Sequence, residues 1–240
     1  MPEGRYAQTG LPVAARFCQP PASAPERHVL KRSLGLRGEF LVVVTGGGEG
    51  SGGLYRRAAA ILETVNDVDV AVICGRNQRL RRRLTRLAER ADSRLTVLGF
   101  VDNMADWLRC ADIVVGKAGP GTIAEAACCA APLVLTSYLP GQEEGNAEFV
   151  VQAGAGSYTP RPGDLASEIA RLRADPDALV VMRAASARIG RPRAAADIAD
   201  LLAKAAEGTE IAEIAIDWSE PAPADLTAPI EPDLVPAGES

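Results

Sequence analysis

The residues best suited to chemistry lie in Gly116–Glu125, which reads GKAGPGTIAE. An apolar run, Asp112–Val115, precedes this stretch and an alanine-rich run follows it, a pattern that predicts a strand, a glycine turn and the start of a helix. The first turn of a helix has unpaired backbone N–H groups and a partial positive charge, and glycine lets that backbone approach a phosphate closely. The stretch is therefore a candidate anion-binding site.

Three side chains in this stretch each allow two interpretations. Thr122 and Glu125 have the spacing T-x-x-E of a capping box, in which both side chains satisfy backbone donors at a helix start. Alternatively, Glu125 points into a cleft and accepts hydrogen bonds from ribose hydroxyls. Spacing alone favours the capping box, and Thr122 can cap the helix in either case. Lys117 is either a cation for a phosphate or a solvated loop lysine.

A second glycine-rich loop, Gly46–Gly53, follows the continuous apolar run Phe40–Val44. It indicates either close backbone approach to a diphosphate or simply a tight turn between a strand and a helix. A dinucleotide fingerprint needs GxGxxG and an acid ending the second strand, but the second strand here ends in Cys74, Gly75 and Arg76. A Walker motif needs GK[S/T] after its glycines, and that is absent. Both of these chemistries are disfavoured.

The apolar pattern alternates between strands and helices, and five strands are expected at residues 40–44, 69–74, 95–98, 112–115 and 133–136. Helical patterns follow several of them, at residues 54–65, 76–94, 147–153, 164–174, 177–189 and 194–206. This alternation predicts an α/β fold with a single doubly wound parallel sheet and helices on both faces. Ligands of such sheets bind at the carboxyl ends of the strands, so the five strand-end loops should line one rim.

Two further groups of polar residues belong to this arrangement. Gln142, Glu143 and Asn146 follow the fifth strand, and Gln plus Glu supply the donors and acceptors that a sugar ring needs, although a solvated turn explains them equally well. The region 76–94 carries eight arginines. A solvated helix face is the favoured interpretation, and the alternative is attraction to an anionic membrane, worth about 1 kcal/mol per charge. Arg76 differs from the others because it ends a strand on the predicted rim.

The composition fits a soluble globular protein, with 47% hydrophobic and 24% charged residues among 240. The net charge of −5 argues against general nucleic-acid binding. The cysteines show no CxxC spacing, which favours a reducing cytosol, and there is no signal peptide or apolar run of membrane-spanning length. His28 is the only histidine, so neither a Ser/His/Asp or Cys/His site nor a metal cluster can be assembled.

Five separated motifs, TGGGEG, ICGRN, GFVDNM, KAGPGTIAEA and PGQEEGN, occur in the order of the monogalactosyldiacylglycerol synthase branch of the glycosyltransferases. That branch is similar to the lipid-II-forming N-acetylglucosaminyltransferase and has the GT-B fold of two Rossmann-like domains. The resemblance covers roughly Gln8–Ala206 and corresponds to the C-terminal, donor-binding half. It implies a residual inter-domain linker with a short helix over 1–35 and a UDP-sugar-binding domain over 36–206. The acidic, proline-rich segment 207–240 is expected to be disordered.

The resemblance also assigns roles to residues. Phe100, Val101 and Met104 would frame uracil, and Glu125 would bind ribose, which reverses the preference from spacing alone. The residues expected to contact the nucleotide are Gly47, Gly48, Arg76, Phe100, Val101, Met104, Gly119, Pro120, Gly121, Thr122 and Glu125, with the glycines and Thr122 at the diphosphate. The residues expected at the sugar are Gln142, Glu143 and Asn146.

The implied reaction is inverting transfer of a hexose from a UDP-sugar to a lipid acceptor such as diacylglycerol, without a metal or other cofactor. Glu143, where lipid-II enzymes have a second glutamine, favours galactose or glucose. The catalytic base and the acceptor site belong to an N-terminal half that this sequence lacks or that a separate protein supplies, so no catalytic residue is assigned. The implied location is the cytoplasm, with peripheral contact at the inner face of the cell membrane.

Three alternatives remain open at this point. The chain is also consistent with the donor-binding subunit of a split UDP-GlcNAc transferase, or with a non-catalytic regulatory module that binds a nucleotide sugar. A third group, the UDP-sugar epimerases, shares the fold but needs acids and histidines in both domains, and the lone His28 counts against it.

Overall fold

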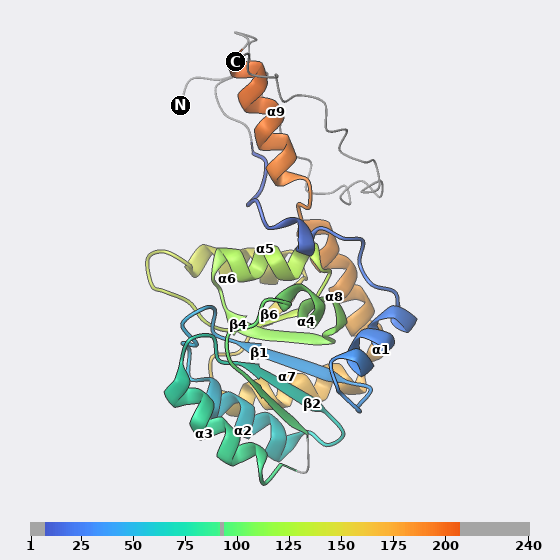
Figure 1. Cartoon of the computed structure of the whole chain (residues 1–240), viewed down its shortest axis with the longest axis vertical. Coiled ribbons are helices and arrows are strands. Elements are labelled where there is room, and N and C mark those ends of the chain that lie inside the picture. The colour runs from blue at the N-terminus through green and yellow to red at the C-terminus, as the bar shows by residue number, and fades with distance from the viewer. Residues whose placement is uncertain (1–7, 92–93, 207–240) are drawn as a thin grey trace, which may run out of the picture.

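The computed structural model describes residues 8–91 and 94–206. These residues form one parallel sheet of six strands with helices packed around it (Figure 1). The strands are β1 (Leu41–Thr45), β2 (Asp69–Ile73), β3 (Leu95–Leu98), β4 (Ile113–Lys117), β5 (Leu133–Ser137) and β6 (Gly156–Tyr158). Their order in space is β3-β2-β1-β4-β5-β6, and every neighbouring pair is parallel. The expected doubly wound sheet is confirmed, with its topological switch point between β1 and β4.

Helices cover both faces of the sheet (Figure 1). The helices of the described residues are α1 (Ala24–Ser33), α2 (Leu54–Thr64), α3 (Gln78–Ala88), α4 (Met104–Cys110), α5 (Pro120–Cys128), α6 (Glu144–Gln152), α7 (Pro162–Ala174), α8 (Pro176–Ile189) and α9 (Ala194–Ala206), with a short 3-10 helix η1 (Ala15–Phe17) before them. Helix α9 extends away from the sheet and covers neither face (Figure 1). On one face α2, α3 and α7 enclose a hydrophobic core, and on the other α4, α5 and α6 enclose a second core with η1. The predicted helical patterns are confirmed in type and position.

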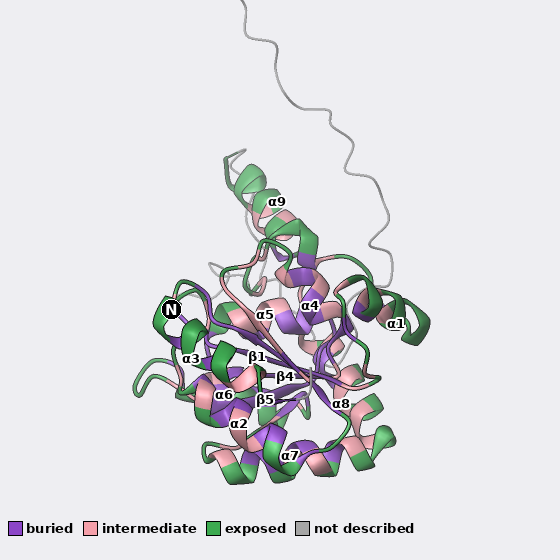
Figure 2. Ribbon diagram, turned by 60° about the horizontal axis from the view of Figure 1, so that its bottom comes forward, coloured by how far each residue is buried: buried purple, intermediate pink, exposed green. Residues whose placement is uncertain are grey.

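The central strands are buried on both faces, as Figure 2 shows for β1, β4 and β5. Side chains alternate along β1: Leu41 and Val43 enter the core under α4 and α5, whereas Val42 and Val44 enter the core over α2 and α7. Burying one such side chain stabilises the fold by about 1.5–3 kcal/mol. Because both faces of the strand need apolar residues, its sequence is continuously apolar instead of alternating between apolar and polar residues.

Strand β6 was not predicted, because its three residues, GSY, contain no apolar pattern. It pairs with β5 from Gly156 to Tyr158, and a Cβ at Gly156 would lie only 2.3 Å from the carbonyl oxygen of Leu133. The arginine-rich helix is also shorter than its pattern, since α3 ends at Ala88. Its apolar stripe is as expected, with Leu80 and Leu84 buried. The segment 207–240 lies outside the described residues.

A buried cation fastens α1 to the amino end of the sheet. The Nζ of Lys31 donates to Oδ2 of Asp112 at 2.6 Å and also to the backbone carbonyl of Glu39. The same Asp112 oxygen accepts the backbone N–H of Leu41 at 2.7 Å. Only 7% of the Lys31 side chain and 15% of the Asp112 side chain are exposed, so this pair belongs to the interior.

Lys31→Met is expected to lower the free energy of unfolding by about 3 kcal/mol, because it leaves Asp112 as a buried charge without its cation. Chemical denaturation monitored by circular dichroism measures the change. The control is Glu39→Gln, which removes only the exposed ion pairs of Glu39 with His28 and Arg32. That control should cost no more than about 1 kcal/mol. Equal losses in the two variants would contradict the role given to Lys31.

Candidate functional site

A cleft opens at the switch point, where the loops after β1, β2 and β3 meet the start of α5. It encloses about 190 Å³. Its lining combines glycine backbone, apolar side chains and one carboxylate, from Arg16, Phe17, Thr45, Gly47, Gly48, Ile73, Gly75, Phe100, Val101, Met104, Thr122 and Glu125. Seven residues of the expected nucleotide set are therefore neighbours in one cleft: Gly47, Gly48, Phe100, Val101, Met104, Thr122 and Glu125.

The preference for a capping box at Thr122 and Glu125 is wrong. Helix α5 begins at Pro120, with Gly119 as the N-cap residue and no side-chain cap. Proline at the first position of a helix has the required φ and lacks the N–H that would be unpaired there, so the helix starts earlier than the T-x-x-E spacing implies. Thr122 thus lies inside the first turn, where its side chain lines the cleft instead of capping the helix.

Glu125 lies one turn further along α5 and is the one carboxylate of the cleft lining. Burial raises its pKa above the ordinary glutamate value, and the positive charge of Arg16 partly offsets this rise. No hydrogen bond holds the carboxylate within the described residues, so both oxygens are available as acceptors for a ligand. The site therefore contains a desolvated acceptor close to the unpaired amides of a helix start.

The glycine loops after β1 and β2 fit against each other without space for side chains. A Cβ on Gly75, whose φ is +55°, would lie 2.2 Å from the carbonyl oxygen of Gly48. The backbone N–H of Arg76 donates to that same oxygen at 2.8 Å. Gly50, with φ +58°, would place a Cβ 2.1 Å from the carbonyl oxygen of Cys74. Glycine is required here by contact between loops as well as by access to the cleft.

Arg76 and Phe100 lie side by side at the mouth of the cleft. The Arg76 guanidinium is 5.2 Å from the centre of the Phe100 ring and also pairs with Glu49 at 3.0 Å. Phe100 is 60% exposed, which is unusual for so large an apolar residue. Arg76 does not line the cleft itself, but it supports the aromatic residue that does.

The expected sugar-binding residues lie further along the rim, outside the cleft lining. Glu143 is buried, and its two oxygens accept from the Nζ of Lys117 at 2.7 Å and from the backbone N–H of Leu139 at 2.9 Å. Asn146 donates to the carbonyl oxygen of Ala118 at 3.0 Å, whereas Gln142 is exposed. Two of the three side chains thus hold the loops after β4 and β5 together.

The remaining residues of the expected nucleotide set lie at the start of α5. Gly119 is buried beside Lys117 and Glu143, and a Cβ there would approach both side chains within 3.5 Å. Gly121 is exposed, with no heavy atom within 4 Å of its Cβ position. Pro120 lines a neighbouring groove together with Asn146. The first turn of α5 therefore separates the cleft from the polar loop that follows β5.

Sequence reasoning missed Arg16 and Phe17, which η1 contributes to the cleft. Phe17 is buried in the core, and the Arg16 guanidinium lies 5.2 Å from the centre of its ring. The only signal was an adjacent cation and aromatic ring in a proline-rich segment. That signal is weak because the segment otherwise has the composition of a linker.

Lys117 is neither a solvated loop lysine nor a free cation, because it pairs with Glu143 and lowers the pKa of that carboxylate. Lys117→Met is expected to reduce stability by about 1–2 kcal/mol, less than for a fully buried pair because 35% of the Lys117 side chain is exposed. The lowered pKa means that the pair stabilises the fold above the ordinary glutamate pKa, and this contribution is lost as pH falls through the lowered value. Denaturation at several pH values tests both statements.

The matched control is Lys204→Met, which makes the same change at an exposed position of α9. It should leave both the stability and its pH dependence unchanged. The pair contributes nothing if the Lys117→Met protein is as stable as this control at neutral pH and if its stability falls in acid by as much as that of the wild type.

Residues 8–91 and 94–206 contain no group of three His, Cys, Asp or Glu side chains placed to hold a metal ion. Over the same residues, no helix has the length and apolar character needed to span a bilayer.

A doubly wound sheet with a glycine-walled cleft at its switch point defines a Rossmann-like α/β domain of the GT-B type. More narrowly, the chain belongs to the family described as the glycosyltransferase family 28 C-terminal domain, whose sequence model matches residues 41–202. This membership confirms the resemblance drawn from the five motifs.

Two relatives illustrate the match in sequence. A probable monogalactosyldiacylglycerol synthase, chloroplastic, from Nicotiana tabacum is 35% identical over 194 residues, covering 77% of this chain and 35% of the relative. The chloroplastic monogalactosyldiacylglycerol synthase 1 of Arabidopsis thaliana is 35% identical over 169 residues, covering 67% of this chain and 31% of the relative. The chain thus spans about a third of the length of these relatives.

Two solved structures illustrate the match in fold. Acinetobacter baumannii MurG superimposes with a TM-score of 0.59 at 24% identity, over 69% of this chain and 52% of that chain. Anabaena HepE in complex with UDP and glucose superimposes with a TM-score of 0.61 at 19% identity, over 80% of this chain and 55% of that chain. At these identities the likeness concerns the fold alone.

Proposed function

We propose that residues 36–206 form the donor-binding domain of an inverting glycosyltransferase, which transfers a hexose from a UDP-sugar to a lipid acceptor such as diacylglycerol. One observation carries this proposal. Residues from four separate motifs, with Gly48, Phe100 and Glu125 among them, gather in the single cleft at the switch point. The named relatives are synthases of a galactolipid, and HepE was solved with UDP and glucose, which supports this class of donor.

In this proposal the cleft divides the nucleotide among its walls. Uracil packs against Phe100, Val101 and Met104, and the ribose hydroxyls donate to Glu125. The diphosphate lies at Gly119–Thr122, where the backbone N–H groups of Gly121 and Thr122 are unpaired in the first turn of α5 and the helix dipole favours negative charge. As the bond to the sugar breaks, the same amides stabilise the charge that develops on the departing UDP.

The polar loop after β5 forms the sugar end of the proposed site. Gln142 is exposed and free to contact hydroxyls of the hexose. Glu143 keeps its charge through Lys117, and an ionised carboxylate only accepts hydrogen bonds. An acid at this position favours galactose or glucose over N-acetylglucosamine. The amides of α5 supply the charge stabilisation for UDP, so the proposal includes no metal cofactor.

The proposal leaves activation of the acceptor hydroxyl to a base on another domain, because the cleft lining offers only Glu125, which is assigned to ribose. An enzyme with a lipid acceptor must also reach that lipid at a membrane surface. We place the chain on the cytoplasmic side of such a surface, in peripheral contact with it.

Isothermal titration calorimetry with UDP, UDP-galactose, UDP-glucose and UDP-N-acetylglucosamine tests the proposal on the chain as it is. We expect binding of UDP, additional affinity for the two hexose donors, and weaker binding of the N-acetylated donor. ADP serves as the control for base recognition and should bind more weakly than UDP. Absence of UDP binding at millimolar concentration would refute the proposal, and equal binding of ADP would refute the assigned uracil contacts.

A further inference from the structure

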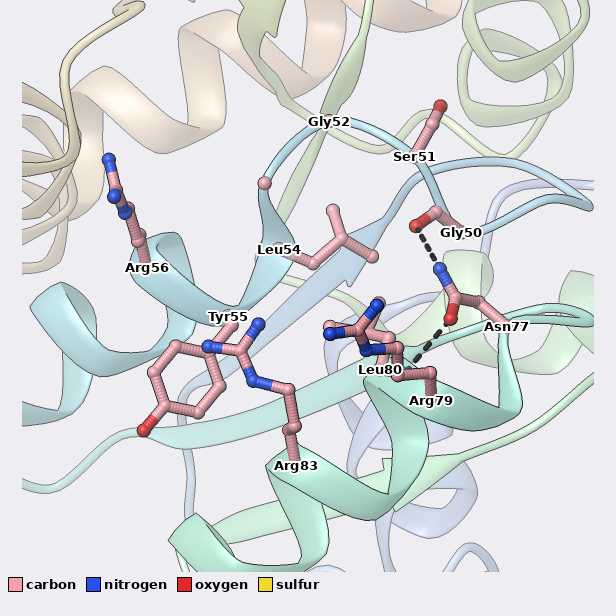
Figure 3. A pocket seen from close by; sticks show the side chains of 11 residues that line it. Gly50, Ser51, Gly52, Leu54, Tyr55, Arg56, Asn77, Arg79, Leu80 and Arg83 are labelled. Carbon is pink, nitrogen blue, oxygen red and sulfur yellow. Dashed lines mark hydrogen bonds between the residues drawn. The ribbon is translucent and has the colours of Figure 1, made fainter.

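A second cavity lies between α2 and α3, on the other side of the loop that follows β1 (Figure 3). It encloses about 540 Å³, more than the cleft at the switch point. Gly47 and Gly48 line the cleft, whereas Gly50–Gly53 line this cavity, and the two linings have no residue in common. We call it the α2–α3 cavity.

Three arginines line the α2–α3 cavity: Arg56 from α2, and Arg79 and Arg83 from α3 (Figure 3). The Arg83 guanidinium lies 4.6 Å from the centre of the Tyr55 ring. The lining of the α2–α3 cavity contains no Asp or Glu, and none of the three arginines forms an ion pair within the part of the chain that the structure describes. A chain of net charge −5 thus concentrates uncompensated positive charge at one hollow.

The backbone wall of the cavity is fixed in position. Asn77 accepts the backbone N–H of Leu80 at 2.9 Å and donates to the carbonyl oxygen of Gly50 at 3.4 Å, so it joins the loop to the start of α3. Figure 3 shows both of these bonds at the edge of the cavity. The arginines are exposed side chains on α2 and α3, and this link ties the loop that leads into α2 to the start of α3. A ligand would therefore meet a preformed site in which only side chains must be ordered.

We propose that the α2–α3 cavity binds a phosphomonoester attached to a small organic group. A phosphomonoester carries a charge of about −1.5 to −2, which matches the uncompensated positive charge of this lining, where Arg79 and Arg83 lie near each other and Arg56 extends away from them (Figure 3). The arginine fork suits the oxygens of a phosphate better than a point charge does. The organic part would contact the Tyr55 ring, Leu54 and Leu80, and the volume lies in the range of about 300–1,000 Å³ that small-molecule sites occupy.

Two sources supply this chemistry, a soluble organic phosphate and the phosphomonoester headgroup of an anionic lipid. A further hollow of about 250 Å³ continues along α3 between Arg83, Arg86 and Arg90, so the positive surface extends beyond the α2–α3 cavity. Binding measurements with a separate probe for each source distinguish the two. The proposal is independent of the donor site, because it uses none of the residues assigned to the UDP-sugar.

The test compares two double variants of the full chain that lose the same charge. Arg79→Gln with Arg83→Gln removes two cations from the cavity, whereas Arg82→Gln with Arg188→Gln removes two exposed cations that do not line it. Calorimetry with sn-glycerol 3-phosphate measures the soluble source. Co-sedimentation with phosphatidylcholine vesicles, with and without phosphatidic acid, measures the lipid source. Thermal unfolding and UDP titration check that each variant remains folded.

We expect the cavity pair to weaken binding of at least one probe by about tenfold or more and the control pair by no more than about twofold, since charge-assisted hydrogen bonds to phosphate depend on position. If only vesicle binding separates the two pairs, the source is the lipid headgroup; if only glycerol 3-phosphate binding does, it is a soluble phosphate. The proposal is overturned if neither probe binds at millimolar phosphate, or if both pairs weaken each probe equally. UDP binding should remain unchanged throughout, so its loss would concern the donor site alone.

Discussion

Glu125→Gln is expected to weaken UDP binding by about 10- to 100-fold and at the same time to raise the thermal stability of the unliganded chain. The loss follows because an ionised carboxylate accepts charge-assisted hydrogen bonds from the ribose hydroxyls, each worth about 1.5–3 kcal/mol. An amide presents one acceptor oxygen and a donor that has no partner on the ribose. Calorimetry with UDP measures the change in affinity, and thermal unfolding without ligand measures the stability.

The gain in stability follows from the raised pKa of Glu125, which burial causes. A carboxyl group whose pKa is higher in the folded state stabilises the fold while protonated, and this contribution is lost as pH rises through the folded-state pKa. At neutral pH the charged carboxylate therefore opposes folding, and glutamine removes the opposition. The stability difference between wild type and variant should disappear in acid, below the ordinary glutamate pKa.

Glu148→Gln is the matched control, since Glu148 is an exposed glutamate of α6 outside the cleft lining. It should change neither UDP affinity nor the melting temperature. A Glu125→Gln protein that melts at a lower temperature but binds UDP normally would show that Glu125 has a structural role, and would refute its assignment to ribose.

Gly75→Ala is expected to destabilise the chain by about 3 kcal/mol and to abolish measurable UDP binding. The added Cβ would lie 2.2 Å from the carbonyl oxygen of Gly48 and 2.8 Å from that of Gly47, at a φ of +55°. Relief requires the loops after β1 and β2 to separate, and both line the cleft. Steric overlap and a left-handed φ without glycine each cost about 1–3 kcal/mol. Chemical denaturation and UDP titration measure the two effects.

Gly163→Ala provides the comparison, because a Cβ there meets no atom within 4 Å and Gly163 lies in the first turn of α7, away from the cleft. It should be neutral or slightly stabilising, as expected for alanine replacing glycine in a helix. If Gly75→Ala were as stable as this control and bound UDP, the loop contact would not be what positions the cleft.

Much of the fold was predictable because the buried strands read directly from the sequence. Val42 and Val44 face one core while Leu41 and Val43 face the other. A strand buried on both faces needs apolar residues at every position, so it appears in the sequence as an unbroken apolar run. Strand β6 fails the same rule, since its glycine, serine and tyrosine are defined by pairing with β5 and not by their own pattern. Pairing between distant segments is invisible to local periodicity.

The cleft was predictable where backbone chemistry defines it and less so where side chains from distant segments complete it. Glycine-rich segments that follow predicted strands can be placed from the sequence, because a parallel sheet brings the carboxyl ends of all its strands to one rim. Arg16 reaches Glu125 from a segment over a hundred residues away, and nothing in its local sequence requires that contact. The partnership of Lys117 with Glu143 likewise depends on how the loops after β4 and β5 fold over each other.

The pairing of β1 with β4 has a consequence for folding kinetics. Val43 pairs with Val114 there, whereas the other pairs of neighbouring strands join segments much closer in the chain, such as Val43 with Ala71. Closing the longest loop carries the largest entropy cost, so this seam is expected to be the slowest to form. The cleft spans the junction of β1 with β4. A nucleotide bound in the cleft would hold the part of the sheet on the β1 side to the part on the β4 side, and would slow their separation during unfolding.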